Sequence, residues 1–175
     1  MTVHAFVDES QRGSYLICAA LVSPGDLASV RTELRALLLS GQRRLHFAQE
    51  RTQRRRSLLT SMSKLPIQVR IYSSTAKEPV ARARAIEALL FDLIALDGRR
   101  LVIERRETSQ DGRERRQIAT AVASGTAPPT ISYDHMAGHE EPLLWVAVAW
   151  AYWARGEWRP RVQPLIEHVS DVDPR

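Results

Sequence analysis

The chain has 175 residues, of which 44% are hydrophobic and 26% charged, with eight glycines, nine prolines and one cysteine. This composition suits one domain with a sizeable core, and it excludes a disordered chain, a collagen-like repeat and a disulfide scaffold. The net charge is +5, no apolar stretch is long enough to cross a membrane, and the first ten residues carry two acids where a signal peptide is basic, so we expect one cytoplasmic domain over 1–175 with no membrane partner.

Two short apolar runs at the start of the chain predict a β-hairpin. Residues 3–7 are β-prone and run into a cluster of turn formers, and residues 15–22 are apolar on both alternate faces, as in a central strand. Apolar residues then recur at helical spacing over 26–40, where Gly41 stands at the expected C-cap, and over 49–64. The first third of the chain is therefore expected to form a hairpin followed by two helices.

The rest of the chain alternates between the two patterns. Strands are expected at 67–72, 101–104 and 130–133. Helices are expected at 81–96, 111–124 and 142–156, the last beginning near Pro142 and leaving a short tail. Such alternation predicts βα units and a largely parallel continuation of an α/β sheet.

Arginine dominates the basic residues, with 23 copies against Lys64 and Lys77. Arginine binds phosphate in a bidentate manner, but coding bias in a GC-rich genome explains such an excess equally well. The segment 43–56 is locally basic, because its single acid is Glu50. We expect it to contact a nucleic-acid backbone through Arg43, Arg44, Arg51, Arg54 and Arg55. The alternative is that these arginines form a solvated helix face.

Acidic residues stand at the ends of three expected strands. Asp8 and Glu9 follow the first, Glu104 follows 101–103, and Asp134 comes just after Tyr133. The ends of parallel strands converge, and carboxylates gathered in this way bind Mg²⁺ or Mn²⁺ in two-metal nucleases. Pleating points only one of Asp8 and Glu9 to a given side of the sheet. The alternatives are turn residues, solvated loops or ion pairs with the neighbouring arginines.

Three other groups have competing interpretations. His46 lies beside the basic segment, where it contacts phosphate, carries a proton or simply packs. Asp111 and Glu114 precede an apolar-periodic segment and predict a helix N-cap with its reciprocal glutamate. His135 and His139 are four residues apart, but their order differs from that of a zinc-protease motif, so zinc is the weaker interpretation.

Several short motifs together resemble the bacterial protein family called domain of unknown function 3800. They are Phe6-Val7-Asp8-Glu9-Ser10, the run 15–22, Leu45-His46-Phe47, the run 101–106 and the run 140–147. The match covers most of the chain. The resemblance implies a ribonuclease-H-like fold, a mixed five-stranded sheet flanked by helices, and by analogy metal-dependent phosphodiester cleavage.

The resemblance also implies a set of site residues. Asp8 would be the central ligand of Mg²⁺ or Mn²⁺, with Glu9, His46 and Glu104 near it. Family members commonly carry an aspartate where this chain has Val148. The sequence therefore predicts either that Glu141 or Asp134 supplies the missing carboxylate or that the site has lost its metal.

The leading functional hypothesis is a nuclease that cleaves RNA or DNA with Mg²⁺ or Mn²⁺. Asp8 and Glu104 would hold the metal, and the arginines of 43–56 would position the substrate backbone. The alternative is a catalytically degenerate module of the same fold that binds nucleic acid or protein. The sequence leaves a homo-oligomer open.

Overall fold

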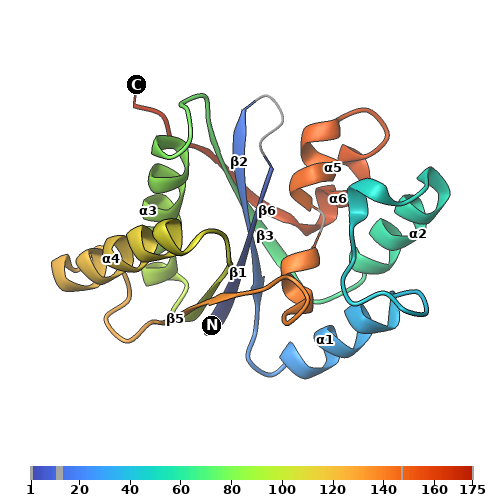
Figure 1. Ribbon diagram of the computed structural model, residues 1–175, viewed down its shortest axis with the longest axis horizontal. Helices are drawn as coiled ribbons and strands as arrows, with labels where there is room; N and C mark the ends of the chain where they lie inside the picture. Colours follow the sequence, from blue (N-terminus) through green and yellow to red (C-terminus); the bar gives the residue numbers. More distant parts are fainter. Residues whose placement is uncertain (1, 11–13, 147, 175) are drawn as a thin grey trace.

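The computed structural model describes residues 2–10, 14–146 and 148–174. These residues form one mixed six-stranded sheet in the order β5-β4-β1-β2-β3-β6 (Figure 1). The strands are β1 (Val3–Ser10), β2 (Tyr15–Val22), β3 (Gln68–Ser74), β4 (Gly98–Glu104), β5 (Ser132–Met136) and β6 (Ile166–Asp171). Strand β1 lies at the centre of the sheet, between β4 and β2.

Helices cover both faces of this sheet (Figure 1). The α-helices are α1 (Leu27–Ala36), α2 (Thr52–Met62), α3 (Val80–Ala95), α4 (Thr108–Ser124), α5 (Val148–Ala154) and α6 (Arg159–Val162). The short 3-10 helices are η1 (Phe47–Gln49), η2 (Pro142–Trp145) and η3 (Gln163–Leu165). Within the described residues, no helix has both the length and the apolarity that crossing a bilayer requires.

The strand pairing confirms the predicted hairpin and the parallel continuation. Strands β1 and β2 are antiparallel, with Asp8 opposite Cys18. Strand β4 is parallel to β1, β5 is parallel to β4, and β6 is parallel to β3. Parallel neighbours need long crossovers, and α3 and α4 supply those that lead into β4 and β5.

Alternation along β1 divides the apolar side chains between two cores. Phe6 belongs to the core under α1, α2, α5 and α6, whereas Ala5 and Val7 belong to the core under α3 and α4. Figure 1 shows these two groups of helices on opposite sides of the sheet. The face to which a β1 side chain points therefore decides which helices it meets.

The C-terminal part of the chain differs from the prediction in two ways. The helix expected over 142–156 is divided into η2 and α5, because Val146 has an extended backbone with φ −66° and ψ 95°. The expected tail contains a sixth strand, β6, which pairs with the edge of β3. Most β6 side chains are exposed on this outer strand, so the alternation of apolar and polar residues that marks a half-buried strand is weak.

The predicted N-cap at Asp111 is wrong. Helix α4 begins at Thr108, and Asp111 lies in its first turn, where its Oδ1 accepts a hydrogen bond from the backbone N–H of Arg106 at 3.1 Å. Glu114 is buried and faces α3. Its carboxylate is used in tertiary contacts, which the local pattern does not reveal.

Candidate functional site

Two carboxylates meet where the central parallel strands end. The last paired residues of β1 and β4 are Val7 and Ile103, and Asp8 and Glu104 follow them. Pleating places both acids on the same face as Phe6, under α1, α2 and α5. The sheet thus brings together two predicted ligands that lie far apart in the sequence.

The electrostatics of Asp8 reflect this proximity. Burial, together with the neighbouring negative charge of Glu104, raises the pKa of Asp8 to about 8. Asp8 Oδ1 accepts one hydrogen bond, from the backbone N–H of Glu9 at 2.8 Å. Two neighbouring negative charges disfavour each other's ionised form. Added positive charge near Asp8 and Glu104 would therefore favour the ionised form of both carboxylates.

Part of that positive charge comes from Arg44. Its Nη1 lies 2.9 Å from Glu104 Oε1. The ion pair passes so close to Gly138 that a Cβ there would lie 2.5 Å from Arg44 Cζ and 2.6 Å from Glu104 Oε1. The indole N–H of Trp145 donates to the carbonyl of Gly138 and fixes this loop. A side chain at position 138 would therefore displace the ends of Arg44 and Glu104 from their present positions.

A hollow of about 420 Å³ opens beside Asp8. The loop 44–49 forms one wall, and Leu144, Trp145 and Trp150 form another. His46 is exposed and lines the hollow together with Asp8. The structure thus places His46 in the same hollow as Asp8, where it is accessible to a ligand.

The donor set at this edge fits one hard divalent cation. Mg²⁺ is usually bound by one or two carboxylates, and water and substrate phosphate oxygens complete its coordination. Asp8 and Glu104 supply two carboxylates, and their mutual repulsion is the kind that a cation relieves. Among the described residues, no group of three or more His, Cys, Asp or Glu side chains is arranged to hold a metal.

The other predicted acids are engaged elsewhere. The Glu9 carboxylate forms ion pairs with Arg82 and Arg106 on the α3–α4 face. Glu9 lines the same two hollows as Asp8, but these arginines take up its carboxylate, because pleating turns adjacent side chains to opposite faces. Its role at the candidate metal site stays a prediction.

The structure brings neither Asp134 nor Glu141 to the Asp8–Glu104 pair. Asp134 lies in the middle of β5, is exposed, and contacts Arg100 at 3.1 Å. Glu141 is buried, lies 2.7 Å from Arg31, and accepts from the backbone N–H of Leu143 at the start of η2. Each already has an arginine partner, and the described residues contain no group of three or more His, Cys, Asp or Glu side chains that could hold a metal. That one of them supplies the missing carboxylate stays a prediction.

Most of the basic segment also has structural partners. Arg54 pairs with Glu50 at 3.0 Å, and Arg55 donates to the Phe47 carbonyl at 3.0 Å and lies over the Trp150 ring at 4.8 Å. Arg44 is the partner of Glu104. Within the described part of the chain, Arg43 and Arg51 are exposed and form no ion pair. Only these two of the predicted nucleic-acid contacts are thus available without breaking an internal contact.

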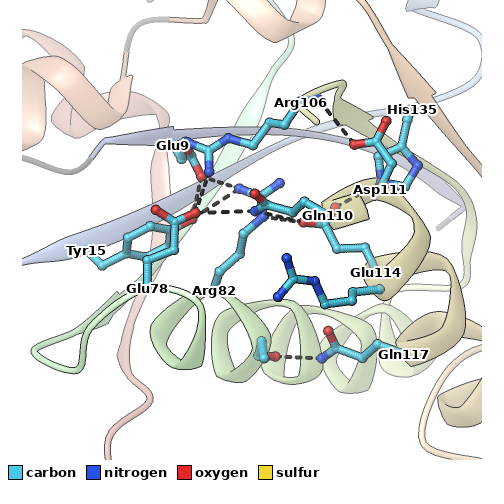
Figure 2. Close-up of polar contacts among 12 residues, drawn as sticks. Glu9, Tyr15, Glu78, Arg82, Arg106, Gln110, Asp111, Glu114, Gln117 and His135 are labelled. Atoms are coloured by element: carbon cyan, nitrogen blue, oxygen red, sulfur yellow. Dashed lines mark hydrogen bonds and ion pairs between the residues drawn. The ribbon is translucent and has the colours of Figure 1, made fainter. Parts of the chain in front are cut away.

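The sequence patterns did not predict a buried polar network between β1, α3 and α4. Arg82 of α3 forms ion pairs with Glu9 and Glu114 and donates to the hydroxyl of Tyr15 at 3.1 Å. His135 Nε2 lies 2.9 Å from Glu114 Oε2. Figure 2 shows these side chains converging between β1, α3 and α4. Arg82, Glu114 and His135 are each 4% exposed or less, so the network is part of the protein interior.

The network makes stability depend on pH through Glu114. Burial opposes ionisation, but hydrogen bonds from His135 and Arg82 prevail and lower the pKa of Glu114 from 4.5 to about 2. The native state therefore binds fewer protons than the unfolded state between these two values. The stabilisation is fully present above pH 4.5 and is lost as the pH falls towards 2.

We expect Glu114→Gln to reduce the loss of unfolding free energy between pH 4.5 and 2. Urea denaturation of the wild type and of Glu114→Gln on both sides of the range measures the slope of unfolding free energy against pH. The wild type loses more stability on acidification than the variant. Parallel curves for the two proteins would mean that Glu114 titrates normally in the native state.

Comparisons with known proteins bear on the fold. No protein-family model matches the chain, and no curated protein matches it. A solved structure, described as the PCNA:RNase HII complex from Archaeoglobus fulgidus, contains a chain that aligns with 92% of this chain and 76% of its own length. The TM-score is 0.54 and the sequence identity is 16%. Together with the mixed sheet and its flanking helices, this similarity shows that the chain has a ribonuclease-H-like fold.

Proposed function

We propose that the protein is a nuclease that cleaves phosphodiester bonds of RNA or DNA with Mg²⁺ or Mn²⁺. The observation that carries the proposal is the Asp8–Glu104 pair, which the ends of two parallel strands hold at the edge of a ribonuclease-H-like sheet. The resemblance to the domain of unknown function 3800 family supports the same assignment, and we propose membership of that family.

Five residues at or near the carboxylate pair have a part in this function. Asp8 and Glu104 would hold the cation, which when bound activates water and stabilises the leaving oxygen. His46 is exposed in the hollow and binds a phosphate oxygen or carries a proton. Arg43 and Arg51 are exposed near the hollow and contact the substrate backbone, which fixes its position without reading its sequence.

Substitution of Asp8 tests the proposal directly. We expect the wild type to cleave labelled single- or double-stranded RNA or DNA with Mn²⁺ or Mg²⁺ and to be inactive in EDTA. Asp8→Asn should abolish cleavage, because it keeps the size of the side chain but removes the charge that holds a cation. It should leave the fold intact, since it also removes the repulsion between Asp8 and Glu104.

The matched control is Asp134→Asn. Asp134 is an exposed strand acid with an arginine partner of its own, so this variant should cleave at the wild-type rate. Metal-dependent cleavage that survives Asp8→Asn would contradict the proposal, as would equal losses in the two variants.

A second candidate is a nucleic-acid- or protein-binding module of the same fold. Two observations favour it: Arg44 already neutralises Glu104, and Val148 is wholly buried in the core rather than exposed in the hollow. For a nucleic-acid-binding module we expect affinity that falls with added salt and is unchanged by EDTA, with no cleavage. Absence of nucleic-acid binding even at low salt would direct the second candidate to a protein partner.

A further inference from the structure

A large hollow lies between α3 and α4, on the face of the sheet opposite α1 and α2. Its volume is about 820 Å³, and its walls are the segments 78–86 and 106–117. Pockets of a few hundred to about a thousand cubic ångströms commonly hold small ligands or cofactors. Neither the carboxylate pair nor His46 lines this hollow, so the proposed cleavage does not account for it.

A smaller hollow of about 320 Å³ lies between it and the carboxylate pair. Its lining includes Arg82 and Arg106, which also line the large hollow. It includes Asp8 and Glu104 as well, and Asp8 lines the hollow that contains His46. The shared residues place three adjacent hollows around the ends of β1 and β4. The hollows beside Asp8 and between α3 and α4 are therefore neighbours around this end of the sheet.

The charges that line the large hollow balance. Three glutamates and three arginines line it, namely Glu78, Glu107, Glu114, Arg82, Arg106 and Arg113. Arg82 is neutralised by Glu9 and Glu114, and Arg106 contacts Glu9 and Glu78. A phosphate group would face this set of carboxylates without an excess of positive charge. The lining therefore suits an uncharged polar group better than an anion.

The remaining lining combines an apolar surface with two carboxamides. Val80 and Ala83 present an exposed apolar surface along α3, next to the buried Ile86. Gln117 donates to the Ala83 carbonyl at 2.7 Å, and Gln110 lies 3.3 Å from Glu78 Oε1 (Figure 2). Both amide groups use an N–H in these contacts, which leaves each amide oxygen available as an acceptor. A flat, neutral group with donors and acceptors on its rim matches this combination, as a nucleobase does.

The floor of the large hollow is held in place before any ligand binds. The buried Arg82 guanidinium is fixed from two sides by Glu9 and Glu114 and by the hydroxyl of Tyr15 (Figure 2). Side chains that are already fixed lose little conformational entropy on binding. The hollow therefore has the rigid polar base and apolar wall of a binding site.

We propose that the hollow between α3 and α4 binds a single nucleobase, that of a nucleotide next to the phosphate held at Asp8 and Glu104. The proposal rests on the proposed nuclease function for that neighbouring phosphate. It adds a second contact that selects unpaired nucleotides, because a base inside a duplex cannot enter the hollow without leaving its stack.

Two exposed alanines provide a matched test. Ala83 lines the hollow, and Ala119 is an exposed residue of α4 that does not. Calorimetric titration in EDTA with each of the four nucleoside 5′-monophosphates, and with a short single-stranded oligonucleotide, measures binding without cleavage. We expect Ala83→Leu to weaken binding by about tenfold or more by filling the hollow, and Ala119→Leu to bind like the wild type.

The side-chain amides give a second measurement. In ¹⁵N-labelled protein, the amide signals of Gln110 and Gln117, assigned from Gln→Ala variants, should shift on adding a nucleoside monophosphate. They should shift equally in Asp8→Asn, because base binding does not require the metal. Absence of shifts, or equal affinities of Ala83→Leu and Ala119→Leu, would overturn the proposal.

The two proposals fail in different ways. If cleavage requires Asp8 but no nucleotide shifts the glutamine amides, the nucleobase site is wrong and the nuclease stands. If nucleotides bind in the hollow and Ala83→Leu blocks them, but no variant cleaves, the base-binding hollow stands and the nuclease is wrong. Binding of the oligonucleotide without the monophosphates would also overturn a site for a single base.

Discussion

Replacing Arg82 with methionine is expected to lower the free energy of unfolding by about 3–5 kcal/mol, the usual effect of removing one partner of a buried ion pair. Arg82 is 4% exposed and neutralises Glu9 and Glu114. Methionine preserves most of the apolar volume of the side chain, so the loss comes from the carboxylates that remain. Of these, Glu114 is the more buried, and it keeps only its side-chain contacts with His135 and Gln110.

Urea denaturation followed by circular dichroism measures this effect, and Arg56→Met is its control. Arg56 also pairs with a glutamate, Glu157 at 2.9 Å, but both side chains are more than 40% exposed, and such pairs contribute little. The Arg56→Met midpoint should lie near that of the wild type. The double variant Arg82→Met with Glu114→Gln should regain part of the loss. Equal midpoints for Arg82→Met and Arg56→Met would show that the network is not a source of stability.

Val148→Asp is expected to destabilise the fold by about 4 kcal/mol or more, since a carboxylate would be buried without a partner. Val148 has no exposed surface and packs in the same core as Phe6. It does not line the hollow beside Asp8. An aspartate here therefore has no access to solvent or to a cation.

The comparison variant is Val148→Ala, which removes apolar contacts without adding charge and should cost about 2 kcal/mol. Urea midpoints of the two variants separate the cost of the charge from the cost of the cavity. A stable Val148→Asp protein with increased metal-dependent cleavage would contradict this interpretation. It would show that the side chain reaches Asp8 and that the wild-type site lacks a ligand.

The sequence predicted those parts of the fold that follow from local periodicity. The hairpin of β1 and β2 and the alternation of strand and helix are visible in the spacing of apolar residues, and the structure confirms both. Asp8 and Glu104 stand immediately after apolar strand residues, so their meeting follows once the strands are parallel neighbours. Asp134 misled the prediction because the expected strand ended too early, whereas β5 runs from Ser132 to Met136.

The buried network could not be predicted in the same way. Arg82 shares helical spacing with Ile86 and Leu89 on the buried face of α3, and a charge on an apolar stripe is a sign of a buried partner. That sign was present in the sequence. Glu114, the partner of Arg82, comes from another helix, however. The packing of α4 against α3 is a tertiary contact that no local pattern encodes.

The place of Asp8 and Glu104 in the topology affects when the site can exist during folding. Along the chain they are separated by β2, β3 and three α-helices, yet they meet only through the parallel ladder between β1 and β4. A chain that has formed its β1–β2 hairpin and the helices that follow it still has no carboxylate pair. Contacts of high sequence separation form late because their loop-closure cost comes first. Under the proposed nuclease function, partly folded molecules would therefore be inactive, and recovery of cleavage on refolding would report completion of the central sheet.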